Sequence, residues 1–224
     1  MTVPNDHPRP NDYPQPNDYP RPDDHPRLSG SWAASLDRAL AVPVGDVLVP
    51  TGYVELDRMI GGLGCGTLTL VCGPPGVGTS TLMMDILRHN AFQQNNAVAL
   101  YCADRVERDI VVQLIAAQAR VRWRTVASGP GRLEDAVDWD VAMRWAAEHG
   151  DAPLRIEASP RLSVDTVIDD LERLGREGEP PRLVIVDPLP AFSDDPDAPR
   201  AVIRAARALK SAAMRLRIPI LATA

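Results

Sequence analysis

Residues 67–72 of the chain read Thr-Leu-Thr-Leu-Val-Cys, and residues 73–81, which follow directly, read Gly-Pro-Pro-Gly-Val-Gly-Thr-Ser-Thr. The first stretch is an apolar run typical of a buried strand, and a helical pattern begins at Thr79. Between the two, glycines let the backbone fold around an anion, and the helix N-terminus adds a favourable dipole. This order predicts a phosphate-binding loop; the alternative is a glycine-rich turn without a ligand. The loop residues are Gly73, Pro74, Pro75, Gly76, Val77, Gly78, Thr79, Ser80 and Thr81.

The loop matches the pattern G-x-x-x-x-G-K-[ST] at every fixed position except the lysine, where Thr79 stands. Ser80 occupies the position of the Mg²⁺ ligand. The missing ammonium normally reaches the β- and γ-phosphates, whereas threonine offers a hydroxyl without charge. Losing such a charge-assisted contact costs on the order of 2–4 kcal/mol, so we expect hydrolysis to suffer most. Arg105 is a candidate to supply the charge, although arginine is the larger side chain.

An apolar strand that ends in an aspartate often supplies the second half of a nucleotide site. Residues 183–187, Leu-Val-Ile-Val-Asp, have this form, and we expect Asp187 to hold Mg²⁺ together with the loop serine. Asp104 follows another apolar run, residues 97–102. Because the carboxyl ends of parallel strands meet at one edge of a sheet, Asp104 and Asp187 are predicted to face the same crevice. A carboxylate at position 104 would orient or deprotonate the attacking water, or act as an N-cap of the next helix.

Apolar runs alternate with helical patterns from residue 44 onward, which predicts an α/β fold. Nearly continuous β-branched runs separated by helices favour a mostly parallel sheet with helices on both faces. The last run ends at Ala224, and we expect it to leave a sheet edge open to pairing. The expected strands are residues 67–72, 97–102, 153–158, 182–187 and 218–224; the expected helices are residues 79–90, 106–119, 139–148, 163–174 and 199–216.

The N-terminal residues have a different composition from the rest of the chain. Residues 4–27 are four proline-rich hexapeptides, PNDHPR, PNDYPQ, PNDYPR and PDDHPR, which exclude both helix and central strand. We therefore expect a disordered tail over residues 1–30 and a short linker helix over residues 31–43. The compact domain is expected to span residues 44–224.

Composition and charge exclude several classes of protein. The net charge of −6 argues against a broad phosphate-binding face, and Lys210 is the only lysine, so any nucleic-acid contact is expected to be local. Cys65, Cys72 and Cys102 lie outside any C-x-x-C pair and are interpreted as small core residues. The apolar runs are too short for a membrane helix, and the start of the chain lacks a signal-peptide pattern. We expect a cytoplasmic protein with no membrane partner.

Taken in order, these motifs resemble one family, the ATPase domain of DnaB-type replicative helicases within the RecA-like P-loop NTPases. The resemblance covers most of residues 51–224 and implies a RecA-like fold, ATP and Mg²⁺ as ligands, and Asp104 at the position of the family's catalytic glutamate. The segments that carry it, besides the phosphate loop, are residues 51–57, 61–63, 101–104, 119–121, 128–129, 152–156, 159–164, 187–189, 209–210 and 218–220.

The sequence departs from this family at positions that carry function. Thr79 replaces the lysine, and Asp104 is one methylene shorter than the glutamate, which draws its carboxylate back from the water. The loop after the Mg²⁺ aspartate helps hold single-stranded DNA in the family, yet here it carries Asp194, Asp195 and Asp197, which would repel phosphates. The sequence ends before the family's glutamine sensor, second DNA loop and arginine finger, so we expect the chain to lack them.

We therefore expect a degenerate helicase-like domain that binds ATP and Mg²⁺ weakly and hydrolyses ATP slowly or not at all. Three alternatives stay open. One is an active ATPase in which Arg105 or a partner supplies the missing charge, another is a non-catalytic protein that docks on a helicase, and the third is a truncated product of a helicase-like gene. The expected partners are ATP and either copies of the chain or other RecA-like or helicase subunits, and stable DNA binding by the chain alone is not expected.

Overall fold

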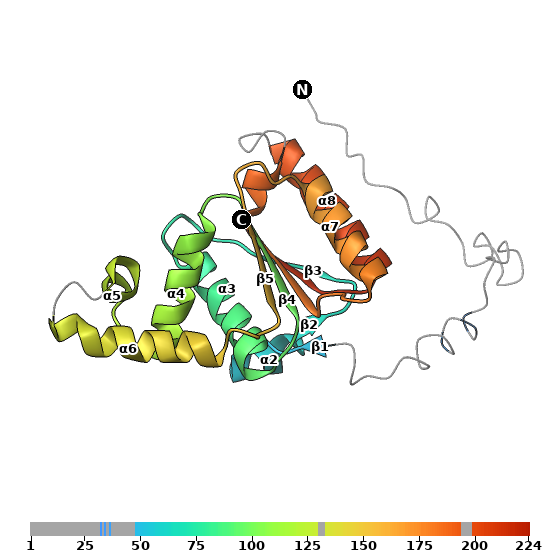
Figure 1. Ribbon diagram of the computed structural model, residues 1–224. Coiled ribbons are helices and arrows are strands. Elements are labelled where there is room, and N and C mark those ends of the chain that lie inside the picture. The colour runs from blue at the N-terminus through green and yellow to red at the C-terminus, as the bar shows by residue number, and fades with distance from the viewer. Residues whose placement is uncertain (1–31, 33, 35, 37–47, 130–132, 194–198) are drawn as a thin grey trace, which may run out of the picture. The chain divides into compact units, whose positions relative to one another are not determined.

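The computed structural model describes residues 32, 34, 36, 48–129, 133–193 and 199–224 (Figure 1). The chain divides into two compact units, residues 1–43 and residues 44–224. In the first unit Trp32, Ala34 and Leu36 are helical. The predicted tail over residues 1–30 and the rest of the predicted linker lie outside the described residues, as do Asp194, Asp195 and Asp197. The assignment of these segments stays a prediction.

Five parallel strands form the central sheet of the second unit, and each arises from one of the predicted apolar runs. Their alternate side chains point to opposite faces, so Leu100 and Cys102 meet one helical layer while Ala99 and Tyr101 meet the other. In spatial order the strands are β3 (Leu68–Val71), β7 (Ile220–Thr223), β6 (Leu183–Asp187), β4 (Val98–Cys102) and β5 (Leu154–Ala158).

The strand order corrects one expectation, because β7 does not leave an open edge. It pairs with β3 on one side and with β6 on the other, and all of its residues are buried. The edges of the sheet are β3 and β5, and Leu70 of β3 is 45% exposed. For the same reason Cys72, which follows β3, is exposed, whereas Cys102 in the interior strand β4 is fully buried. The interpretation of Cys72 as a core residue is therefore wrong.

Helices cover both faces of the sheet, as predicted (Figure 1). On one face α7 (Val164–Glu177) and α8 (Pro199–Leu216) pack on β4, β6 and β7. The N-terminus of α7 is fixed by a capping box between Ser163 and Thr166, and its C-terminus by Gly178 in the left-handed conformation. On the opposite face lie α3 (Thr79–Arg88), its π-helical extension η3 (His89–Gln93) and α4 (Glu107–Ala119).

A smaller cluster forms outside α4, where α5 (Trp123–Ser128) and α6 (Leu133–Glu148) pack against its outer side. The predicted helix over residues 139–148 is only the second part of α6. The apolar pattern does not extend to the first part of this helix, where Val137 is 69% exposed. The remaining elements are short: β1 (Leu48–Val49) and β2 (Leu63–Gly64) form a separate antiparallel pair, α2 (Val54–Ile60) lies between them in sequence, and η4 (Leu189–Phe192) follows β6. Sequence patterns did not predict these short elements.

The turn before α2 is held by Asp57. Its carboxylate accepts hydrogen bonds from the backbone N–H and the hydroxyl of Thr51, both at 2.8 Å, and from the N–H of Gly52 at 3.3 Å. Gly52 adopts a φ of 86°, and a Cβ there would lie 2.6 Å from Cγ of His89. Thr51, Gly52 and Asp57 therefore act as one local unit, which lets the backbone at Gly52 lie close to His89 of η3.

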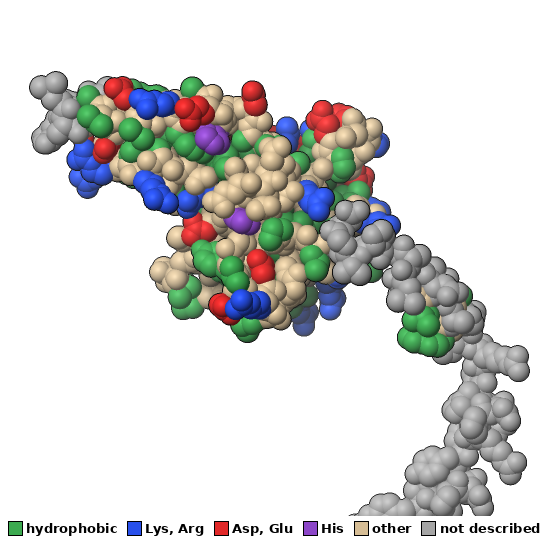
Figure 2. Space-filling model, turned by 90° about the horizontal axis from the view of Figure 1, so that it is seen from below, with side chains coloured by type: hydrophobic (Ala, Val, Ile, Leu, Met, Phe, Trp, Pro, Cys, Tyr) green, Lys and Arg blue, Asp and Glu red, His purple; other side chains and the backbone are tan. Residues whose placement is uncertain are grey.

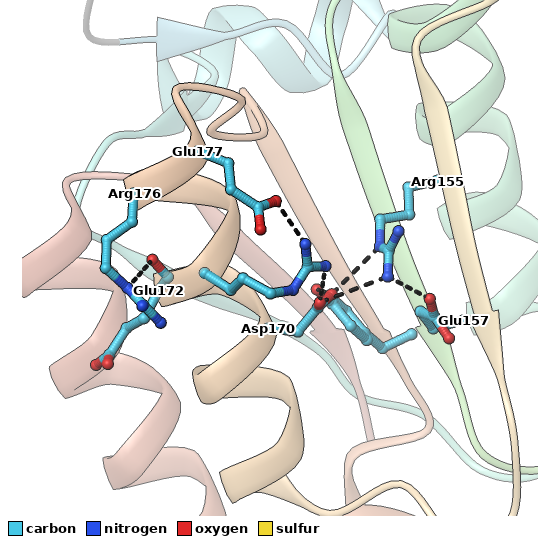
Figure 3. A network of polar contacts seen from close by, with 8 residues as sticks. Arg155, Glu157, Asp170, Glu172, Arg176 and Glu177 are labelled. Carbon is cyan, nitrogen blue, oxygen red and sulfur yellow. Dashed lines mark hydrogen bonds and ion pairs between the residues drawn. The ribbon is translucent and has the colours of Figure 1, made fainter.

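A polar network joins α7 to the edge strand β5 (Figure 3). Asp170 of α7 accepts hydrogen bonds from the Tyr101 hydroxyl at 2.7 Å, from Arg173 at 2.5 Å and from Arg155 of β5 at 3.2 Å. Burial raises the pKa of the Tyr101 phenol, and its hydrogen bond to Asp170 adds to the shift. Burial also acts to raise the pKa of Asp170, but the hydrogen bonds from Tyr101 and Arg173 outweigh it and hold this pKa below its usual value.

We expect Asp170→Ala to lower the free energy of unfolding by about 1–3 kcal/mol at neutral pH, because the buried Tyr101 hydroxyl loses its acceptor. Since folding lowers the pKa of Asp170, stabilisation by its carboxylate is present above about pH 4 and is lost as the pH falls further. Chemical denaturation at neutral pH and at about pH 3 should show the difference between the wild type and the variant shrinking in acid. Asp169→Ala, at an exposed neighbour on α7, is the matched control, and equal losses in both variants would contradict the assignment.

Candidate functional site

The predicted phosphate loop lies at the edge of the sheet where the parallel strands end. It connects β3 to α3, and its base is tied to the end of the chain, because Gly73 N–H donates to the carbonyl of Ala224 at 3.1 Å and Ala224 N–H donates to Val71 at 3.0 Å. Within the loop, Val77 N–H donates to the carbonyl of Pro74 at 3.2 Å. The loop is thus a closed turn whose position follows that of β3 and β7.

The loop presents a helix N-terminus to solvent. Residues 73–78 are all exposed, and Gly78 is the N-cap of α3 with a φ of 100°. A side chain at Gly78 would be strained in this left-handed conformation, which explains the glycine. The first N–H groups of a helix have no partner within it, and with the helix dipole they attract an anion. Pro74 and Pro75 contribute no N–H, so the donors come from the second half of the loop.

Asp187 lies at the end of β6 with its side chain fully buried. Its Oδ1 accepts hydrogen bonds from Ser80 Oγ at 3.1 Å and from Thr223 Oγ1 at 2.5 Å. Ser80 belongs to the first turn of α3 and Thr223 to the end of β7. The structure therefore brings Ser80 and Asp187 together, as the sequence predicts, and it adds Thr223, which no sequence pattern indicated.

Arg105 occupies the other oxygen of the same carboxylate. Its Nη2 donates to Asp187 Oδ2 at 2.8 Å, and its Nη1 donates to Gln113 Oε1 of α4 at 3.0 Å. The guanidinium also lies near Asp104, with 3.9 Å between Nε and Oδ1. The Arg105 side chain is 24% exposed, so it is partly buried yet open to solvent. The arginine is held between two carboxylates at the mouth of the site.

Asp104 lies beside Asp187, as predicted from the ends of β4 and β6. Cys102, Asp104 and Asp187 each have one atom that could bind a metal, and these three atoms lie within 4.8 Å of one another. The Cys102 thiol donates to Asp104 Oδ1 at 3.2 Å, and burial raises the pKa of this thiol. Asp104 does not cap α4, whose N-cap is Val106 without a side-chain hydrogen bond, so the N-cap interpretation is wrong. The catalytic role of Asp104 stays a prediction.

The side chains around Asp187, as they are arranged, do not favour the binding of a divalent ion. Mg²⁺ prefers oxygen ligands in near-octahedral geometry and keeps several bound waters. A carboxylate that holds the ion must therefore bind the ion directly or accept hydrogen bonds from these waters. Both oxygens of Asp187 are engaged by protein donors, and one of these donors is the cationic guanidinium of Arg105. The assignment of Mg²⁺ to Ser80 and Asp187 therefore stays a prediction that requires Arg105 to move away.

The sequence of the chain matches DnaB-type helicases. Residues 48–224 match the family model described as DnaB-like helicase C terminal domain. The chain is 28% identical over 177 residues to the replicative DNA helicase DnaB of Leifsonia xyli subsp. xyli, which covers 78% of this chain and 38% of the relative. It is also 28% identical over 180 residues to DnaB of Haemophilus influenzae, again 78% of this chain and 38% of the relative. The chain thus spans about two fifths of the length of these relatives.

Two solved structures share the fold. One, described as an ATPase domain, has a TM-score of 0.73 at 19% identity and covers 88% of this chain and 71% of that chain. A DnaB-like replicative helicase, whose structure was described together with its interactions with primase, has a TM-score of 0.70 at 19% identity and covers 88% of this chain and 48% of that chain. At these identities the likeness establishes the RecA-like α/β fold.

We expect Thr223→Val to lower the free energy of unfolding by about 2 kcal/mol, because valine keeps the volume but removes a donor to the buried Asp187 carboxylate. Thr223→Ser keeps the hydroxyl and is the control, with an expected loss below about 1 kcal/mol. Chemical denaturation of both variants measures the difference. If the valine and serine variants are equally stable, the hydroxyl of Thr223 does not stabilise the carboxylate.

Proposed function

Because the chain belongs to the DnaB-like helicase C-terminal domain family, related to DNA replication, we propose that it binds ATP at the loop of residues 73–81. The observation that carries the proposal is the placement of the loop. An exposed glycine-rich turn opens α3, and the first turn of that helix contacts Asp187 at the end of a neighbouring strand. Backbone N–H groups and the helix dipole would hold the phosphates.

The same site is poorly equipped for hydrolysis, and we expect turnover to be slow or absent. Thr79 supplies no charge for the phosphates, and the half-exposed carboxylate of Asp104 already accepts a hydrogen bond from the Cys102 thiol and lies 3.9 Å from Arg105. The lost lysine alone is expected to slow the reaction by roughly thirty- to a thousandfold. The chain would then act as a nucleotide-binding member of the family with little ATPase activity.

Our expectations about DNA and protein partners rest on the relatives and not on the geometry of this site. On the face in Figure 2, basic and acidic side chains are interspersed, which does not favour a wide phosphate-binding surface there. We therefore expect no stable DNA binding by the chain alone, and assembly with copies of itself or with helicase subunits. None of the described helices combines the length and apolar character that a membrane crossing requires.

Titration of the purified protein with a fluorescent ATP analogue tests the proposal. We expect saturable binding that is lost in Gly78→Asp, because the new side chain is strained at a φ of 100° and adds negative charge at the helix N-terminus. Unlabelled ATP should displace the analogue. A wild-type protein that shows no binding up to millimolar nucleotide, while folded by circular dichroism, would contradict the proposed function.

We also expect Thr79→Lys to tighten nucleotide binding by about tenfold or more, since it restores a cation at the position that faces the phosphates. Gln94→Lys adds the same charge at an exposed position just after η3, outside the phosphate loop, and is the matched control. The same titration measures both variants. Equal affinities in the two variants would mean that residue 79 does not face the nucleotide.

A further inference from the structure

The Asp187 carboxylate is fully engaged by groups of this chain. Two hydroxyls donate to Oδ1, from Ser80 and Thr223, and the Arg105 guanidinium donates to Oδ2 at 2.8 Å. The carboxylate has no exposure to solvent. Its negative charge is therefore balanced by the partly buried Arg105, at the position where a nucleotide site of this kind would place a hydrated divalent ion.

Arg105 is held in this position by more than one contact. It follows β4 by three residues, which places it at the same edge of the sheet as Asp187, and Gln113 of α4 accepts a second hydrogen bond from its Nη1 at 3.0 Å. The opposite charge of Asp104 lies on its other side. A guanidinium has five N–H donors; the bonds to Asp187 and Gln113 use two of them, and a further one interacts with the Cys102 sulfur. The partly exposed side chain keeps donors for an incoming anion.

A divalent ion and this guanidinium compete for one carboxylate. An ion beside Asp187 would stand next to the positive charge of Arg105, and it would have to displace a charge-assisted hydrogen bond to reach Oδ2. The sulfur of Cys102, which is near the same oxygens, is a soft ligand that does not suit Mg²⁺. The geometry therefore favours the arginine over the metal.

We propose that Arg105 takes the place of the divalent cation, so that the loop binds the polyphosphate of a nucleotide as a metal-free anion. The inference rests on the proposed nucleotide binding, but its central element, the exclusion of a divalent ion by Arg105, is testable without nucleotide. Arg105 both neutralises Asp187 and faces the phosphates with its remaining donors. The Arg105 side chain would then supply the positive charge that both a lysine at position 79 and a divalent ion would otherwise provide.

Titration with Mn²⁺ alone, followed by electron paramagnetic resonance of the free ion, tests the exclusion directly. We expect the wild type not to take up Mn²⁺ at this site in the submillimolar range. Arg105→Met should bind Mn²⁺ at least about tenfold more tightly than the wild type, because Asp187 no longer pairs with the guanidinium. Arg108→Met, at a 68% exposed arginine of α4, is the matched control and should behave like the wild type. Equal Mn²⁺ affinity in the wild type and Arg105→Met would overturn the proposal.

Titration of the fluorescent ATP analogue in excess EDTA and in excess Mg²⁺ tests the second part. The wild-type affinity should agree within about threefold between the two conditions, whereas Arg105→Met should lose about tenfold or more in EDTA and regain affinity with Mg²⁺. Arg105→Lys keeps a cation and should retain much of the metal-free binding. The proposal would be overturned if the wild type bound the analogue about tenfold or more tightly in excess Mg²⁺ than in EDTA.

The two experiments separate the possible failures. If the wild type binds no nucleotide in either condition, the proposed function fails, and the Mn²⁺ titration still decides whether Arg105 excludes the ion. If Arg105→Met does not fold, as judged by circular dichroism, the wild-type comparison between EDTA and Mg²⁺ and the Arg105→Lys variant decide the proposal.

Discussion

The burial of the Asp187 carboxylate is the constraint on which this end of the structure depends. A fully buried charge is tolerated only when it is paired and hydrogen-bonded, and here the partners come from three different parts of the chain. Ser80 ties α3 to β6, Thr223 ties β7 to β6, and Arg105 ties the segment after β4 to the same point. One carboxylate thus fixes the relative positions of the phosphate loop and the interior strands.

The parallel sheet makes this convergence possible. Because β3, β7, β6 and β4 run in one direction, their carboxyl ends lie at one edge, where Thr223, Asp187 and Asp104 come at or just after the ends of β7, β6 and β4. On the face of the sheet that α7 covers, the Tyr101 hydroxyl of β4 donates to Asp170 of that helix. The two hydrophobic layers thus follow from the alternation of side chains along each strand, and the polar edge follows from the common direction of the strands.

Much of this fold could be predicted from the sequence, because the five strands are continuous apolar runs and the helices between them are long. Asp104 and Asp187 could be placed side by side from the ends of their strands, and Ser80 could be placed near Asp187 from its position in the loop motif. The strand order could not be predicted from these runs, which is why β7 was expected at an edge although it lies between β3 and β6. The contacts of Arg105 and Thr223 also escaped prediction, since the direction of a side chain depends on packing that no local pattern encodes. Two-residue strands such as β1 are too short to give a periodic signal.

The ion pair between Arg105 and Asp187 also limits how this sequence can drift. Losing Arg105 alone leaves the fully buried charge of Asp187 without its cation, and breaking a buried pair in this way costs about 3–5 kcal/mol, a large share of the about 5–15 kcal/mol that holds a domain folded. Substitutions of Arg105 are therefore expected to destabilise the fold whether or not a nucleotide is bound. A change at position 105 is thus expected to be tolerated only together with a change at position 187.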